Sequence, residues 1–131
     1  MSALAIDTNA YAAFLLGDAT AVRAINEAEE VHVPLIVLAE LLAGFAGGSR
    51  AEHNHARLDH FLASQRAVVM NPEEKTARHY AAILSELRAR GRPMPTNDVW
   101  IAALVRQHRV PLLTFDVHFS WVPGINLVIQ S

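Results

Sequence analysis

Short apolar segments alternate with longer helical segments along the whole chain, and this alternation limits the possible folds more than any other feature. Five segments have the length and composition of short buried strands: 4–6, 31–33, 67–70, 111–115 and 125–129. Strands that are buried on both faces and joined through helices form parallel sheets. The sequence therefore predicts a three-layer α/β fold, with a short parallel sheet of four to five strands flanked by helices.

The helices are predicted from apolar residues at helical spacing and from capping side chains. Thr8 and Asp18 are expected to cap the first two helices, Asn71 the fifth, and either Thr96 or Asn97 the sixth. The predicted helices cover 8–16, 18–28, 35–45, 51–64, 72–90 and 97–108.

The composition describes one folded domain, which we expect to span residues 1–131. Hydrophobic residues make up 52% and charged residues 18% of the chain, which excludes a disordered protein. No apolar run is long enough to span a membrane, and no secretory signal is predicted. The absence of cysteine excludes disulfides and thiolate metal sites, and it is compatible with the reducing cytoplasm, where we expect the protein.

Two carboxylates follow predicted strands. Asp7 ends the first strand, and Asp116 ends the fourth in the segment PLLTFD. Ligands of open parallel sheets bind at the carboxyl ends of the strands, so both residues are candidates for a functional site. Each also has an ordinary explanation, because Asp7 can begin a helix and Asp116 can stand in a turn.

Two further carboxylates lie on predicted helices. Glu40 is the only ionisable residue between His32 and Arg50, in a helix that is apolar on nearly every face, so we expect its side chain to enter the interior or a cleft. A structural ion pair with an arginine is the alternative, since an unpaired buried charge is costly. Asp98 falls in the first turn of its helix, where the helix dipole alone can account for an acidic residue.

Considered together, the four carboxylates suggest a metal site. Asp7, Glu40, Asp98 and Asp116 would repel one another severely in a shared pocket unless a cation lay among them. Oxygen ligands suit Mg²⁺ or Mn²⁺ rather than zinc, and no arrangement of histidines offers a zinc site.

The segments IDTN, PTNDVWIAA and LLTFDVHF, with Glu40 in its apolar helix, resemble the PIN-domain ribonucleases over essentially the whole chain. The likeness is greatest to the VapC toxins of type II toxin–antitoxin pairs. It implies a Mg²⁺- or Mn²⁺-dependent endoribonuclease that hydrolyses RNA phosphodiesters, with transfer RNA as one expected substrate and a 5′-phosphate as one product. The metal ligands and catalytic residues would be Asp7, Glu40, Asp98 and Asp116.

The resemblance also implies roles for neighbouring residues. Thr8 and Asn9 would fix the first carboxylate, and Thr114 would supply a supporting hydroxyl. One position departs from the family: the residue before the last acid is often Asn or Arg, whereas this chain has Phe115. That difference leaves open how Asp116 is oriented.

The expected partners are an RNA substrate, a VapB-type antitoxin and a second copy of the chain, with no membrane. Arg88, Arg90 and Arg92 lie shortly before Asp98 and could contact RNA phosphates, although Arg88 and Arg90 could equally be ordinary cations at a helix C-terminus. The apolar residues of the 35–64 helices are more numerous than a small sheet needs, which favours a homodimer. Trp121 and Phe119 could stack on bases, but packing explains them better.

Three alternative functions can be compared with the sequence. A metal- or RNA-binding module without cleavage stays open because of Phe115. A phosphoacceptor signalling domain needs a lysine after a late strand, whereas the only lysine, Lys75, opens a helix. A phosphatase with an aspartate nucleophile needs Asp-x-Asp after the first strand, whereas the chain has Asp-Thr-Asn from Asp7.

Overall fold

The computed structural model describes residues 2–129 and contains one five-stranded sheet. All four strand pairs are parallel, in the order β3-β2-β1-β4-β5, which confirms the predicted α/β class. The strands are β1 (Ala3–Ile6), β2 (Glu30–Pro34), β3 (Ala67–Met70), β4 (Leu112–Thr114) and β5 (Leu127–Ile129).

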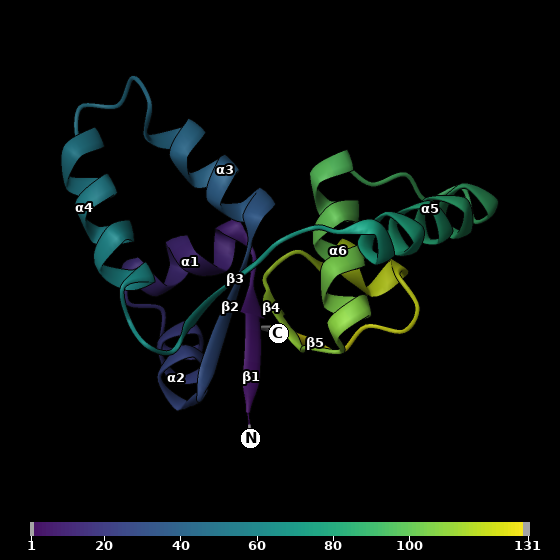
Figure 1. Cartoon of the computed structure of the whole chain (residues 1–131), viewed down its shortest axis with the longest axis horizontal. Coiled ribbons are helices and arrows are strands. Elements are labelled where there is room, and N and C mark those ends of the chain that lie inside the picture. Colours follow the sequence, from purple (N-terminus) through teal and green to yellow (C-terminus); the bar gives the residue numbers. More distant parts are fainter. Residues whose placement is uncertain (1, 130–131) are drawn as a thin grey trace.

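Helices cover both faces of this sheet. Figure 1 shows α1 to α4 on one side and α5 and α6 on the other. No helix within residues 2–129 is both long and apolar enough to cross a membrane. The helices are α1 (Thr8–Leu15), α2 (Ala19–Glu27), α3 (Leu35–Phe45), α4 (Ala51–Leu62), α5 (Glu74–Ala89), α6 (Thr96–His108) and the 3-10 helix η1 (Val117–Trp121).

The core is centred on β1 and on helix α6. Ala5 and Ile6 in β1, and Leu112 and Leu113 in the neighbouring β4, are fully buried. In α6 the five consecutive residues 101–105 are buried, so this helix is held firmly against the rest of the domain. The carboxyl end of β1 and the first turn of α6 are therefore rigid supports for any site built on them.

The cap of α1 differs from the prediction. Asp7, not Thr8, is the capping residue, because its carboxylate accepts a hydrogen bond from the backbone N–H of Ala10 at 2.8 Å. Thr8 is instead the first residue of the helix, and its hydroxyl is free to donate to Glu40. The predicted cap of α2 is confirmed, since Asp18 accepts from the N–H of the third residue along.

The predicted caps of α5 and α6 are wrong. Helix α5 begins later than expected, at a capping box in which Glu73 and Thr76 exchange side-chain and backbone hydrogen bonds. In α6 the capping position is occupied by Pro95, which makes no side-chain cap bond. Asn97 consequently lies inside the helix, with its amide available for other contacts.

Helix α3 is less buried than its apolar sequence predicted. Only Val37 and Leu41 are buried, while Leu35 and Leu42 are 44% and 43% exposed. Among the apolar residues of the α3–α4 hairpin, Leu58 is buried and Phe61 packs against the core. The hairpin thus uses part of its apolar surface internally and leaves a face of α3 exposed.

Candidate active site

Asp7 is a buried carboxylate at the carboxyl end of the central strand. It is 5% exposed, and its two oxygens are held by different partners. The Ala10 N–H donates to Oδ1 at 2.8 Å, and the Thr114 hydroxyl donates to Oδ2 at 2.5 Å. Burial raises the pKa of Asp7, and these two hydrogen bonds offset only part of that rise. The side chain is therefore fixed in a position that disfavours its charged form.

Thr114 connects the two carboxylates that follow strands. It is fully buried at the end of β4, next to β1. Its hydroxyl donates to Asp7 and accepts a hydrogen bond from the backbone N–H of Asp116 at 3.0 Å. A single hydroxyl thus forms hydrogen bonds with both acidic residues.

Asp116 caps the 3-10 helix η1. Its Oδ1 accepts from the backbone N–H of His118 at 2.9 Å and lies 3.0 Å from Nδ1 of the same residue. Phe115, the residue that departs from the family pattern, is half-buried and packs against the core. The orientation of Asp116 is therefore set by His118 and by Thr114, without a polar neighbour at position 115.

Glu40 is held by two uncharged donors. The Thr8 hydroxyl donates to Oε1 at 2.6 Å, and the Asn97 amide donates to Oε2 at 3.4 Å. No arginine within residues 2–129 lies at ion-pair distance from Glu40, so the alternative of a structural ion pair is not seen there. The sequence indicates only a capping role for Asn97, because its contact with Glu40 joins residues 57 positions apart.

The contacts of Thr8 and Asn9 differ from those that the resemblance implied, in which both residues would fix Asp7. Thr8 contacts Glu40 rather than Asp7. Asn9 is exposed, and its side chain makes no hydrogen bond within the described part of the chain. Support for Asp7 comes from Ala10 and Thr114 instead.

Asp98 lies in the first turn of α6 and is electrostatically coupled to the other three acids. Its pKa is raised to about 6, first by burial and then by the negative charges of Asp116, Glu40 and Asp7, while His118 lowers it. Charges affect one another's pKa strongly only over short distances, so the four carboxylates share one region of the molecule. We call these four residues the acidic cluster.

The acidic cluster has the donor chemistry of a magnesium or manganese site. Its ligand atoms are all carboxylate oxygens, which hard divalent cations prefer. Within residues 2–129 none of the four pairs with a lysine or arginine, and the one ion-pair contact of the cluster is that of His118 with Asp116. No three acidic or histidine side chains of these residues are grouped closely enough to form a ready-made metal site. The chemistry fits a divalent cation, and Asp7, Glu40 and Asp116 are each held by protein donors.

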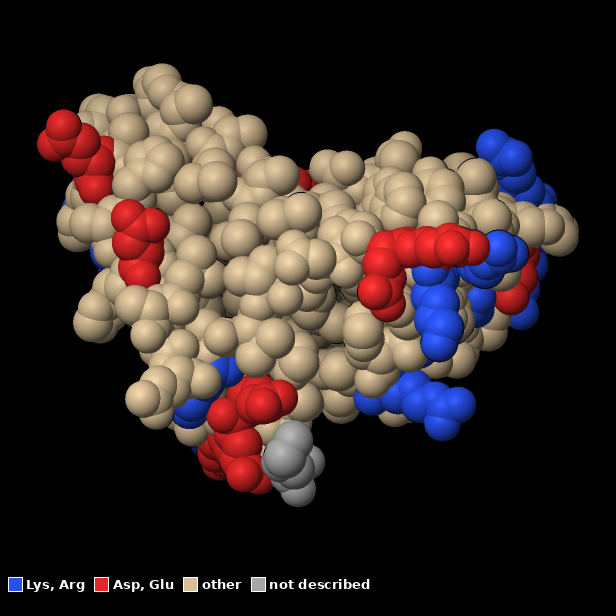
Figure 2. All heavy atoms as spheres, in the orientation of Figure 1, with Lys and Arg blue, Asp and Glu red and all other residues tan. Residues whose placement is uncertain are grey.

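The arginines predicted to contact RNA fall into two groups. Arg90 and Arg92 line a cavity together with Ser120 and Trp121, next to η1. Arg88 is exposed in the last turn of α5 and does not line it. Figure 2 shows acidic atoms at the floor of a hollow between the two sides of the molecule, while lysine and arginine atoms gather mainly over α5 and α6.

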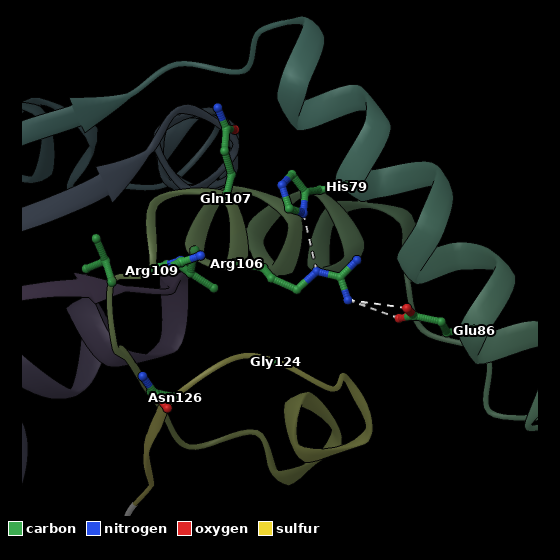
Figure 3. A pocket seen from close by; sticks show the side chains of 9 residues that line it. His79, Glu86, Arg106, Gln107, Arg109, Gly124 and Asn126 are labelled. Atoms are coloured by element: carbon green, nitrogen blue, oxygen red, sulfur yellow. Dashed lines mark hydrogen bonds and ion pairs between the residues drawn. The ribbon is translucent and has the colours of Figure 1, made fainter.

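A second polar cavity lies near the C-terminus of α6, and its lining contains both an arginine and a carboxylate that pair with each other. It has a volume of 550 Å³ and lies between α5, α6 and the segment before β5 (Figure 3). Arg106 donates to Glu86 at 3.1 Å and to Nδ1 of His79 at 3.4 Å. Arg109 stands at the edge of the cavity in a left-handed backbone conformation. Here the largely buried Arg106 has a carboxylate partner.

Comparison with known proteins identifies relatives of the whole domain. The PIN domain family model matches residues 4–125. Ribonuclease VapC4 of Mycobacterium tuberculosis is 30% identical over 76% of this chain and 76% of its own length. Among solved structures, VapBC2 from Rickettsia felis bound to a promoter DNA fragment matches with a TM-score of 0.89 and 22% identity, covering 98% of this chain and 99% of that one. DNA-bound VapBC from Salmonella typhimurium matches with a TM-score of 0.88 and 23% identity, over 98% of both chains.

Proposed function

Because the chain belongs to the PIN-domain family and, within it, to the VapC ribonucleases, we propose that it is a metal-dependent endoribonuclease and the toxin of a toxin–antitoxin pair. The observation that carries the proposal is the acidic cluster, in which four coupled carboxylates have no lysine or arginine partner among residues 2–129. The substrate is RNA, with transfer RNA as the first class to test.

Asp7 and Asp98 are the proposed direct ligands of Mg²⁺ or Mn²⁺. When bound, such an ion supplies a more acidic water and stabilises the charge that develops on the phosphate. Glu40 and Asp116 complete the site, as further ligands or by orienting the attacking water. Hydrolysis by water needs no covalent intermediate on the protein and leaves a 5′-phosphate and a 3′-hydroxyl.

The supporting residues keep this site in place. Thr114 orients Asp7 and Asp116 through its single hydroxyl. Thr8 and Asn97 hold the two oxygens of Glu40 without neutralising its charge. These hydrogen bonds restrict the side chains of Asp7, Asp116 and Glu40, which reduces the entropy that they lose when a cation binds.

The proposed partners are an antitoxin of the VapB type and a second copy of the chain, in the cytoplasm. Leu35 and Leu42 on α3 and Leu16 after α1 are large apolar side chains that remain exposed, Leu16 to 87%. Exposed apolar side chains that gather in one patch mark protein interfaces, and these three residues are the proposed contacts. Sedimentation at micromolar concentration tests the dimer, and a monomer under those conditions would contradict it.

A metal- or RNA-binding module that has lost cleavage is the second candidate. It is favoured by one observation, namely that no three ligands are already grouped within residues 2–129. Such a protein would bind RNA and divalent ions without turnover.

The decisive experiment compares cleavage of transfer RNA with Mg²⁺ or Mn²⁺ and with EDTA. We expect cleavage by the wild type only with metal, and none by Asp7→Asn or Asp98→Asn. Glu74→Gln, which removes an exposed carboxylate of α5, is the matched control and should cleave normally. Cleavage in EDTA would contradict the metal mechanism, and binding of RNA without any cleavage would support the second candidate.

A further inference from the structure

A cationic cavity lies beside the acidic cluster. It has a volume of 530 Å³ and is lined by Arg90, Arg92, Ser120 and Trp121. The two arginines come from the end of α5 and the loop that leads to α6, while the other two residues end η1. Segments about 30 positions apart in the sequence thus meet to form it.

Both arginines are anchored on the same residue. The guanidinium carbon of Arg92 lies over the Trp121 ring, 5.1 Å from its centroid, which is a cation–π contact. Nη1 of Arg90 donates to the Trp121 carbonyl at 3.3 Å. Arginine loses considerable rotamer freedom when it is ordered, so this anchoring prepares the two side chains for a ligand.

The cavity offers positive charge without a compensating anion. Within residues 2–129 no carboxylate lies at ion-pair distance from Arg90 or Arg92, whereas Arg78 pairs with Glu74. The Ser120 hydroxyl donates its proton to the carbonyl of residue 117 at 2.6 Å, so it does not supply a donor to the cavity. The free donors are guanidinium N–H groups, whose planar arrangement suits a phosphate.

One side chain joins this cavity to the acidic cluster. The His118 ring lies 4.5 Å from the Trp121 ring, and its Nδ1 lies 3.0 Å from Oδ1 of Asp116. The cavity is thus connected to Asp116 through His118 and Trp121, and a polyanion that spans both places would put one phosphate at the acidic cluster and another at the arginines. RNA has this regular spacing of phosphates, whereas an acidic protein segment would have to supply a carboxylate at that point.

We propose that Arg90 and Arg92, arranged by Trp121, form a subsite for a phosphate that flanks the scissile bond of a single-stranded RNA. The proposal rests on the proposed function for the identity of the ligand. Trp121 is a positioning residue: it acts through the two arginines, because its ring already contacts Arg92 and His118.

The test measures binding of a fluorescent single-stranded RNA in EDTA, where cleavage does not interfere. We expect Arg92→Gln to weaken binding by about threefold at moderate salt and to lower the salt slope by about 0.7, the contribution of one phosphate contact in a single strand. Arg78→Gln removes the same charge from a paired arginine outside the cavity, and it should change both quantities much less.

Variants of Trp121 test the positioning role. Trp121→Ala should weaken binding without removing a charge, and Trp121→Phe should restore most of the affinity, because a phenyl ring can still support Arg92. Thermal unfolding of both variants identifies any loss of fold. If Trp121→Ala is unfolded, the comparison of Arg92→Gln with Arg78→Gln decides the matter.

Equal effects of Arg92→Gln and Arg78→Gln would overturn the proposal, as would an absence of binding to single-stranded RNA by the wild type. Loss of binding to an acidic antitoxin segment with unchanged RNA affinity would assign the cavity to a protein partner and also overturn it. If the wild type fails to cleave RNA but Arg92→Gln still weakens binding, the subsite stands and the proposed hydrolysis fails.

Discussion

The charged residues near the two ends of helix α6 differ in whether they have a partner of opposite charge. Near its C-terminus, Arg106 is largely buried and donates to Glu86 and to the carbonyl of residue 123, so its charge has partners on two sides (Figure 3). Near its N-terminus, the negative charges of three other carboxylates raise the pKa of Asp98, which forms no ion pair with a lysine or arginine among residues 2–129.

The difference shows that the acidic cluster is not a by-product of a fold that cannot pair its charges. The same helix, packed against the same core, neutralises a charge at one end and leaves the pKa of Asp98 raised to about 6 at the other. Such a perturbed group is destabilising unless a ligand compensates it, and perturbed groups are concentrated at functional sites. We therefore expect a cation to bind near the N-terminus of α6, where the charge of Asp98 is not compensated.

The largest expected effect is on catalysis by Asp98→Asn. Removing a proposed metal ligand should lower the initial rate of RNA cleavage by roughly 100-fold or more, the loss typical for a group that stabilises charge in an active site. Glu86→Gln removes the partner of Arg106 near the C-terminus of α6. This variant should cleave at nearly the wild-type rate when it is assayed well below its own melting temperature. Equal losses in the two variants would mean that the two ends do not differ in function.

Thr114→Val tests how the acidic cluster is held. The substitution keeps the shape of the side chain but removes the hydroxyl that orients Asp7 and Asp116. We expect the cleavage rate to fall by about 10- to 100-fold, as for other residues that orient metal ligands. Circular dichroism should show an intact fold, and a variant with unchanged activity would remove Thr114 from the account.

Arg106→Gln tests the paired end. Its loss leaves Glu86 without its cation, and we expect the free energy of unfolding to fall by about 1–3 kcal/mol, less than for a fully buried pair because Glu86 is partly exposed. Urea titration measures this quantity. A double-mutant cycle with Glu86→Gln should show coupling, and strictly additive effects would contradict the pairing.

The smallest expected effect is the pH dependence of the metal-free protein. The pKa of Asp98 in the folded protein is about 6, above its ordinary value of 3.8. Its contribution to stability is therefore complete below pH 3.8 and is lost as the pH rises through about 6. At neutral pH, Asp98→Asn should therefore be more stable than the wild type, by about 1 kcal/mol after allowance for solvent screening. Urea midpoints across this range measure the trend, and a less stable Asp98→Asn in EDTA would contradict it.

The sequence was sufficient to predict the elements that carry the site. The alternation of strands and helices led to the parallel sheet, and the positions of Asp7 and Asp116 after β1 and β4 followed from it. The placement of Asp98 in the first turn of α6 was also correct. These features depend on local composition and on a general property of parallel sheets, so they can be read from one sequence.

Contacts between distant residues could not be predicted. Asp7 and Thr8 are both good capping residues. The structure shows that Asp7 caps α1 while the Thr8 hydroxyl donates to Glu40, which is far away in the sequence. The sequence likewise indicates a cap at Asn97, whereas its amide donates to Glu40 in the structure. The sequence favours a packing role for Trp121, because its contact with Arg92 depends on how the loop after α5 folds back on η1.

Binding of Mn²⁺ to the wild type, Asp98→Asn and Glu86→Gln, followed by isothermal titration calorimetry, tests the central claim most directly. We expect saturable binding by the wild type and by Glu86→Gln, with binding weakened at least about tenfold in Asp98→Asn. No binding by the wild type, or equal binding by all three proteins, would contradict the account of the acidic cluster as the cation site.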